Sequence, residues 1–211
     1  AVDNNSKAHL VFFRGLSDTL CYSTNQSGSW ITTKFLLPSS TSHYRPSIDV
    51  DDNEKVHIAY YGWEGGNSYI YYQTNISGFW ERIRFNQSDT RDPALTVDES
   101  INVHISYNTY NIPRQIYYLS NRTGNWVAQV AASTSYDQPN SCINRDSNGS
   151  IHIIYVGYSI DREIYYATNA SGPWVATNIT QNSYQDDGYG RYFSIDNNGY
   201  GHIAFMAYGS G

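Results

Sequence analysis

A motif of about 48 residues recurs along the whole chain, and this repeat restricts the possible folds more than any other feature. A His-[Leu/Ile]-x-[Phe/Tyr] run occurs five times, with its histidines 48, 47, 48 and 50 residues apart, and an aspartate stands six residues before each. The pairs are Asp3 and His9, Asp51 and His57, Asp98 and His104, Asp146 and His152, and Asp196 and His202. A second block, Tyr22 to Trp30, recurs at Tyr72 to Trp80, Tyr118 to Trp126 and Tyr166 to Trp174. A fixed period of this length is typical of propellers and solenoids.

Each repeat has the pattern of β-strands. In the second copy we expect strands over 46–51, 56–61, 69–74 and 80–85, which we call A to D from the axis outwards. These runs are rich in Ile, Val, Tyr and Phe, and turn residues separate them. Four strands in one repeat of this length predict a β-propeller blade, since blades of known propellers take ~40–50 residues.

The repeat count predicts an all-β propeller with four four-stranded blades and a two-stranded C-terminal remnant, in a ring of four or five blades. We expect one domain over 1–211, with blades at approximately 1–37, 45–86, 92–132 and 139–180 and a partial blade at 191–211. The first blade starts with only a stub of strand A, and the last stops after strand B. An incomplete blade exposes a strand edge that can pair with another chain. The ring therefore closes either within one chain or between chains.

Charge and hydropathy exclude two classes of partner. Thirteen Lys and Arg against nineteen Asp and Glu give a net charge of −6, so we expect no nucleic-acid binding. No apolar run approaches the ~18 residues of a membrane span. Only 15% of the residues are charged, and 21 are tyrosines. Such a surface is suited to contact with sugars or with another copy of the chain.

The Asp–His pairs obey the repeat, which favours a structural role over a catalytic one. The aspartate and the histidine can meet across the A–B hairpin, where the carboxylate would orient a buried imidazole. Metal binding or acid–base chemistry is the alternative. We expect no cofactor. Calcium is a weaker alternative. The A–B hairpins are rich in Asp and Asn, as the first half of a calcium loop is, but they lack the glutamate at the twelfth position of an EF-hand loop.

Four Asn-x-[Ser/Thr]-Gly segments stand at the C–D hairpins, starting at Asn25, Asn75, Asn121 and Asn169. Asn and Gly are turn formers, and each segment is also an N-glycosylation sequon. A secreted glycoprotein is consistent with both interpretations, so we expect an extracellular or cell-surface location.

Residues outside the repeat pattern gather in the B–C and D–A loops, which share one face of a propeller. The candidate ligand-binding residues are Arg14, Trp63, Glu64, Tyr110, Arg114, Tyr158 and Arg162. Aromatic rings beside arginines and carboxylates suit sugar recognition through stacking and bidentate hydrogen bonds. An ordinary polar surface and a subunit contact are the alternatives. Arg45, Arg91 and Arg191 precede strand A in three blades and form a candidate anion site.

The segments Ser47-Ile48-Asp49 and 194–199 (Ser-Ile-Asp-Asn-Asn-Gly) resemble degenerate Asp-box repeats of bacterial neuraminidase-like extracellular propellers. The resemblance extends loosely over the whole chain and implies a propeller fold, secretion and carbohydrate contact. Sialidases bind a carboxylate with three arginines, which Arg45, Arg91 and Arg191 could mimic. They also use six blades and a Tyr–Glu nucleophile pair, and the sequence does not identify the glutamate.

These observations predict a non-enzymatic, secreted β-propeller that acts as a self-assembling structural subunit of a surface layer or filament. Its partner would be another copy of itself, joined through edge strands into a homo-oligomer or polymer. The alternative is a carbohydrate-binding lectin or adhesin that uses the loop face to bind glycans. A sialidase-like glycoside hydrolase is the third interpretation.

Overall fold

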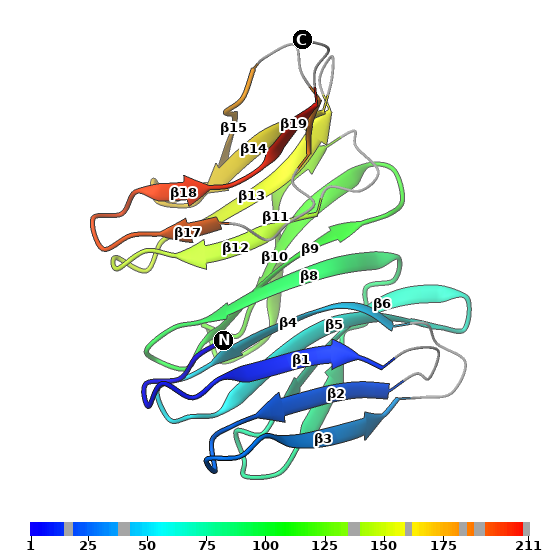
Figure 1. The fold of residues 1–211 in the computed structure, drawn as a ribbon. Coiled ribbons are helices and arrows are strands. Elements are labelled where there is room, and N and C mark those ends of the chain that lie inside the picture. Colours follow the sequence, from blue (N-terminus) through cyan, green and yellow to red (C-terminus); the bar gives the residue numbers. More distant parts are fainter. Residues whose placement is uncertain are drawn as a thin grey trace. The chain divides into compact units, whose positions relative to one another are not determined.

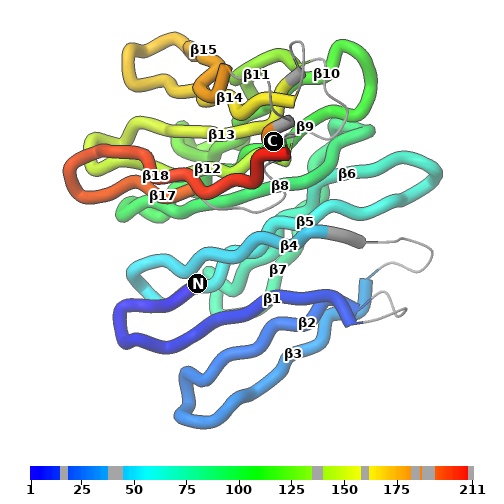
Figure 2. The backbone as a smooth tube through the Cα atoms, turned by 45° about the horizontal axis from the view of Figure 1, so that its top comes forward, coloured from blue at the N-terminus to red at the C-terminus, as the bar shows by residue number. Residues whose placement is uncertain are grey.

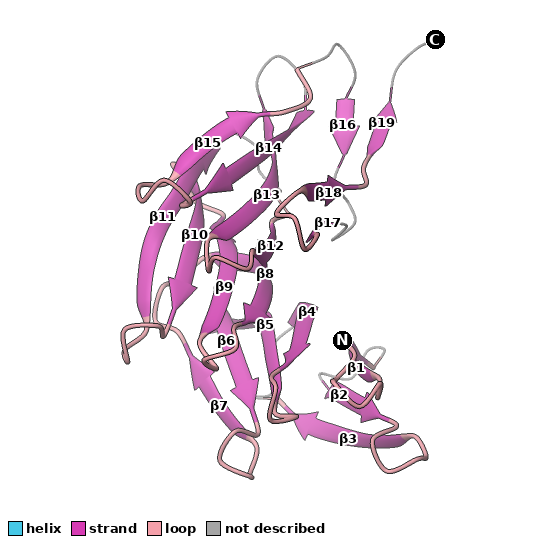
Figure 3. Cartoon of the chain, turned by 90° about the vertical axis from the view of Figure 1, so that its left-hand side faces the viewer, coloured by secondary structure: helices cyan, strands magenta, loops and turns pink. Residues whose placement is uncertain are grey.

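The computed structural model describes residues 1–14, 19–37, 43–134, 140–158, 162–181, 185–187 and 193–208. Every regular element in this part of the chain is a β-strand, and Figure 3 shows only strands and loops. The all-β prediction is confirmed. Among the described residues, no helix is long and apolar enough to cross a membrane.

The strands pair in sheets that follow the repeat (Figure 1). The first repeat forms a three-stranded sheet of β1 (His9–Phe13), β2 (Thr19–Thr24) and β3 (Ile31–Leu36). The second forms β4 (His43–Val50), β5 (Val56–Glu64), β6 (Asn67–Thr74) and β7 (Glu81–Arg84). The third forms β8 (Thr90–Val97), β9 (Val103–Thr109), β10 (Arg114–Ser120) and β11 (Val127–Thr134). The fourth forms β12 (Cys142–Arg145), β13 (Ile151–Tyr158), β14 (Arg162–Thr168) and β15 (Val175–Asn178).

The predicted blades are therefore present, and the fold is a β-propeller. The expected stub of strand A in the first blade is a single bridge between Val2 and Ala8. The chain divides into two compact units, Ala1–Val103 and His104–Gly211, and each is described separately below. The single-domain assignment and its blade boundaries stay predictions.

The C-terminal remnant differs from the expected pair of strands. β17 (Phe193–Ile195) and β18 (Gly201–Ile203) form the predicted A–B hairpin, which Figure 2 shows at the red end of the tube. The second strand, however, does not continue to residue 207. The chain instead forms a separate strand, β19 (Met206–Tyr208), which pairs with β16 (Gln185–Asp187). The polar sequence of β16 did not predict a strand, and its Asp186 is fully buried.

Stacked tyrosine pairs explain much of the tyrosine content. Tyr60 and Tyr71 are direct cross-strand partners on β5 and β6, with ring centroids 5.3 Å apart and an interplanar angle of 7°. Tyr107 and Tyr117 repeat this arrangement at 5.3 Å, and Tyr155 and Tyr165 at 5.4 Å. Large rings facing each other across two strands bury apolar area within each sheet.

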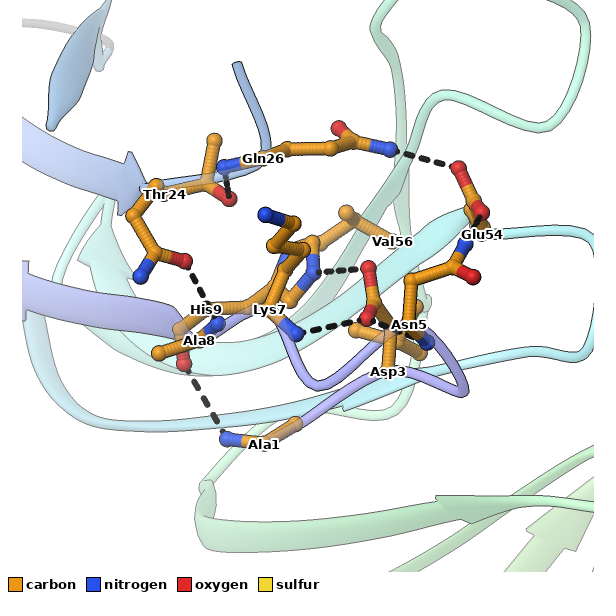
Figure 4. A network of polar contacts seen from close by, with 12 residues as sticks. Ala1, Asp3, Asn5, Lys7, Ala8, His9, Thr24, Gln26, Glu54 and Val56 are labelled. Atoms are coloured by element: carbon orange, nitrogen blue, oxygen red, sulfur yellow. Dashed lines mark hydrogen bonds and ion pairs between the residues drawn. The ribbon is translucent and has the colours of Figure 1, made fainter. Parts of the chain in front are cut away.

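Polar contacts join the A–B turn of the second repeat to the A–B and C–D turns of the first (Figure 4). Gln26 donates to Glu54 at 2.8 Å, and Asn5 also donates to Glu54. Asn4 donates to Asp52 at 3.0 Å. These side chains are exposed, so the bonds orient neighbouring turns but add little stability.

Cys21 and Cys142 are both buried, and neither forms a disulfide.

Candidate functional site

The Asp–His pairs form hydrogen-bonded chains with a third residue. His57 Nε2 lies 3.1 Å from Asp51 Oδ2, and its Nδ1 lies 2.5 Å from the hydroxyl of Tyr72. Since an ionised carboxylate can only accept, Nε2 carries the proton and Nδ1 accepts from the tyrosine. Burial raises the pKa of Tyr72 to about 12, so its hydroxyl keeps the proton that it donates.

The same chain recurs in other repeats. Asp3, His9 and Tyr22 are linked at 3.1 and 2.7 Å. In the fourth repeat His152 Nδ1 lies 2.5 Å from the Tyr166 hydroxyl, whereas its Nε2 lies 3.3 Å from Asp146 Oδ2 without hydrogen-bond geometry. In the third repeat His104 Nδ1 lies 2.7 Å from Tyr118, and in the fifth His202 lies 3.1 Å from Asp196.

These aspartates also hold the A–B turns. Asp51 accepts the backbone amides of Asn53 and Lys55, each at 2.9 Å, and Asp98 holds its own turn in the same way. Burial alone would raise the pKa of Asp3, but hydrogen bonds from two backbone amides and from His9 lower it below its usual value. Both carboxylate oxygens of Asp3 and of Asp51 are thus engaged within the fold. The structural role predicted for the pairs is consistent with this geometry.

Sequence reasoning missed the tyrosine. Its signal was present, because a tyrosine begins all four copies of the second block at 22, 72, 118 and 166. Strand pairing places this residue beside the histidine, and the sequence does not show that pairing directly.

The sequon asparagines have a structural task. The side-chain oxygens of Asn25, Asn75 and Asn169 each accept the backbone amide at the start of strand B at 2.8 Å. The asparagine that precedes the tight turn therefore also joins the C–D hairpin to strand B through a hydrogen bond. Glycosylation at these residues and at Asn121 stays a prediction. The described ranges contain no group of three or more His, Cys, Asp or Glu residues placed so that it could hold a metal ion.

In the first unit the predicted ligand-binding residues Trp63 and Glu64 contact neighbouring side chains. The guanidinium of Arg91 lies over the Trp63 ring, 4.9 Å from its centroid. Glu64 accepts from the hydroxyl of Tyr71 at 2.8 Å and from Arg84 at 3.0 Å. Aromatic, cationic and anionic groups therefore do gather here, but largely as partners of one another.

The hydrogen bond from Tyr71 to Glu64 joins the two residue types that form the nucleophile pair of sialidases, and the sequence alone did not reveal it. It does not support the sialidase interpretation. Only 2% of Tyr71 is exposed, and its ring is stacked on Tyr60. Burial and the neighbouring carboxylate raise the pKa of Tyr71, whereas a nucleophilic phenol needs a lowered one.

The three arginines of the candidate anion site are not equivalent. Arg45 Nε pairs with Asp92 Oδ1 at 3.3 Å, whereas Arg91 lies over Trp63. Arg45 and Asp92 occupy the same repeat position, and both have a left-handed backbone, with φ of 50° and 53°. Arg191 lies outside the described residues. The two described arginines thus have different partners, and the anion site stays a prediction.

A cavity of about 340 Å³ opens in the second unit, and we call it the Tyr155–Tyr165 cavity. The stacked rings of Tyr155 and Tyr165 form part of its wall. The rest is lined by Gly157, Pro113, Arg114, Ser133 and Thr134. Arg114 also lies 6.0 Å from the centroid of the Tyr110 ring, so one predicted ligand-binding residue lines the cavity and a second lies beside it.

Gly157 determines the shape of this cavity. A Cβ atom at position 157 would lie 2.4 Å from two carbons of the Tyr165 ring. No real Cβ approaches a ring so closely, so the Tyr165 ring can lie across strand β13 only because residue 157 is glycine. The sequence offered no reason to single out this glycine.

The other predicted loop residues stand at strand ends. Arg14 follows β1, and its backbone amide donates to Thr19 at 3.1 Å. Arg162 begins β14 opposite Tyr158, which ends β13. Trp63 and Glu64 are near the end of β5 in the first unit.

No family model matches the sequence, and no curated protein matches it. Solved structures do resemble the fold. An ulvan lyase, described as a new polysaccharide lyase family PL25, superposes with a TM-score of 0.64 at 12% identity, over 88% of this chain and 56% of that one. This chain thus spans little more than half of that enzyme. An endo-arabinase from Bacteroides thetaiotaomicron superposes with a TM-score of 0.62 at 17% identity, over 100% of this chain and 88% of that one. An α-L-arabinanase from Penicillium chrysogenum superposes with a TM-score of 0.60 at 10% identity, over 94% of this chain and 71% of that one.

These similarities support the expected relation to carbohydrate-active propellers at the level of the fold. They also correct one prediction. The expectation of a non-enzymatic protein is wrong, because the similar structures are those of enzymes. The expectation rested on the Asp–His pairs, which obey the repeat, but a structural role for repeated residues does not exclude catalysis by residues outside the repeat. Nothing in the comparisons supports the structural role in a surface layer or filament.

Proposed function

We propose that this chain is a carbohydrate-active β-propeller that binds a glycan in the Tyr155–Tyr165 cavity. The observation that carries the proposal is the composition of its wall, where aromatic rings lie beside a guanidinium and two hydroxyls. Its volume of about 340 Å³ falls within the range of small-molecule sites, ~300–1,000 Å³.

Each wall group matches a feature of a sugar. The ring of Tyr165 offers a flat apolar surface for the C–H face of a sugar ring. Arg114 offers several N–H donors in a fixed plane, which suit hydroxyl or carboxylate oxygens. The hydroxyls of Ser133 and Thr134 both donate and accept, as sugar hydroxyls do.

The similar solved structures support the ligand class. They include a polysaccharide lyase, an endo-arabinase and an arabinanase complexed with arabinobiose. We therefore choose ulvan and arabinan as glycans to test, together with xylan, because a xylan β-1,4-xylosidase from Bacillus halodurans also superposes on this chain.

The test is binding of the full chain to these polysaccharides by affinity gel electrophoresis and calorimetry. We expect Arg114→Ala to weaken binding at least about tenfold, because it removes the charged donor of the wall. The matched control is Arg122→Ala, an exposed arginine in a C–D turn of the same unit, and it should bind like the unaltered chain. Equal binding by both variants would remove the cavity as the site. Failure of the folded chain to bind any of the three glycans would refute the proposal for this ligand class.

A second candidate function is cleavage of the bound glycan, which the similarity to enzymes favours. Glu163 is the cross-strand partner of Gly157, so both lie on the sheet face that carries Tyr155 and Tyr165. Its carboxylate is buried and accepts from Thr180. Glu163 is therefore the candidate acid for this reaction.

Release of reducing ends and of unsaturated products from the three polysaccharides tests cleavage. We expect Glu163→Gln to abolish release while binding persists, and Glu81→Gln, at an exposed position, to leave it unchanged. No release by a chain that binds the glycan would reject cleavage and retain binding.

An extracellular or cell-surface location accords with a polysaccharide ligand. It also fits the four sequons in exposed C–D turns. Secretion from a eukaryotic host, followed by glycosidase treatment and mass measurement, would show whether these turns carry glycans.

A further inference from the structure

The tryptophan of the second repeat fills a defined socket in the first unit. The Trp80 ring lies 5.3 Å from the ring of Tyr22 and 4.7 Å from that of Phe35, both in the preceding repeat. Trp80 also packs against the core cluster that contains Val56 and Ile58. In the second unit Trp174 lies 5.4 Å from Tyr118 of its preceding repeat. The tryptophan that closes the second block of one repeat therefore covers the tyrosine that begins the same block of the preceding repeat.

The second unit contains the same socket around Tyr166 without a tryptophan in it. A cavity of about 220 Å³ is lined by Tyr166, Ile179, Phe193, Ile195, Gly201 and Ile203, among others, and we call it the Tyr166 socket. In the repeat register, Tyr166 corresponds to Tyr22 and Ile179 to Phe35. Gly201 corresponds to Val56, so the socket has more room at this position than its counterpart has.

Trp30 is the tryptophan that matches this socket. It stands at the repeat position of Trp80 and Trp174, yet 56% of it is exposed. The other four tryptophans of the chain are all partly buried. The adjacent Ile31 is also exposed, so an apolar surface extends from the indole along β3.

We propose that Trp30 of one copy seats in the Tyr166 socket of a second copy, so that chains associate head to tail. The indole would meet the same kinds of groups that surround Trp80, a tyrosine ring and aliphatic side chains. The two surfaces are different patches of the chain, which makes the contact heterologous. Such contacts build a closed ring of subunits or an open filament, depending on the rotation between copies.

The first test is the mass of the full chain as a function of concentration, by analytical ultracentrifugation. We expect concentration-dependent dimers or larger species. Trp30→Ala should raise their dissociation constant by about 30-fold or more, as expected for a buried interface tryptophan. The matched control is Phe79→Ala, which removes a ring that is 80% exposed from the equivalent turn of the second repeat. The control should assemble normally. A chain that stays monomeric at every concentration, or one whose assembly is indifferent to Trp30→Ala, overturns the proposal.

Crosslinking distinguishes a second copy from the same chain. One chain carries Ser29→Cys, at the exposed position next to Trp30, and another carries Ile179→Cys in the wall of the socket, so that the indole is kept in both chains. We expect a short bis-maleimide to join the two chains when they are mixed. The unaltered chain is the control, and its two cysteines are buried. If the mixture gives no joined chains, while a chain with both substitutions crosslinks internally as a monomer, the socket accepts its own indole and the proposal is wrong.

Discussion

The substitution Gly157→Ala tests the link between one glycine and the Tyr155–Tyr165 cavity. The added methyl group would lie 2.4 Å from two ring carbons of Tyr165, and ordinary contact requires about 3.4 Å or more. The ring must therefore move by about 1 Å, which disturbs its stacking on Tyr155. Overpacking of this kind costs about 1–3 kcal/mol. For a chain of this length we expect a fall in melting temperature of about 2–4 °C per kcal/mol.

A double-mutant cycle with Tyr165→Ala isolates the contact. In the Tyr165→Ala background the new methyl group meets no ring, so Gly157→Ala should cost almost nothing there. The coupling free energy, measured by chemical denaturation, should be about 1–3 kcal/mol. The strand itself tolerates a side chain here, because Thr109 stands at the equivalent position of the third repeat. An equal cost of Gly157→Ala in both backgrounds would show that the Tyr165 ring is not the cause.

Three further predictions concern the repeated hydrogen bonds. Tyr72→Phe should destabilise the chain by about 1–3 kcal/mol, since it leaves the buried Nδ1 of His57 without its donor, whereas Tyr200→Phe at an exposed position should be neutral in thermal melting. Burial lowers the pKa of His57, so the unfolded chain takes up a proton first, and stability should fall as the pH drops below about 6.5. It should fall again below pH ~4, because the aspartates of the first, fourth and fifth repeats have a lowered pKa in the folded chain, so the unfolded chain takes up these protons first; denaturation at a series of pH values that shows no loss below 6.5 would contradict this reasoning. Asn75→Asp removes the sequon but retains the oxygen that accepts from the Val56 amide, so it should leave the stability unchanged. Asn75→Ala removes both and should lower the free energy of unfolding, measured by urea denaturation, by about 1 kcal/mol.

The repeat made most of the fold predictable. Runs rich in Ile, Val, Tyr and Phe, such as 56–61, predicted strands, and the second repeat forms them within a few residues of the expected ends. The C-terminal strands were harder, because Gln185–Asp187 has no apolar pattern and its pairing with Met206–Tyr208 depends on tertiary contacts. The candidate site was predicted only in part. Arg114 was singled out from the loops, whereas Tyr155, Tyr165 and Gly157 looked like ordinary repeat residues.

The sequence by itself determined the architecture, since a period of about 48 residues with four strands and regular turns allows few solutions other than propeller blades. It also determined the Asp–His pairs, because a spacing of six residues across a tight hairpin brings the two side chains together locally. Only the tertiary structure decided which tyrosine completes each pair, which rings border a cavity and which socket is empty. These properties depend on contacts between strands and between repeats that are tens of residues apart, where packing rather than local spacing selects the neighbours.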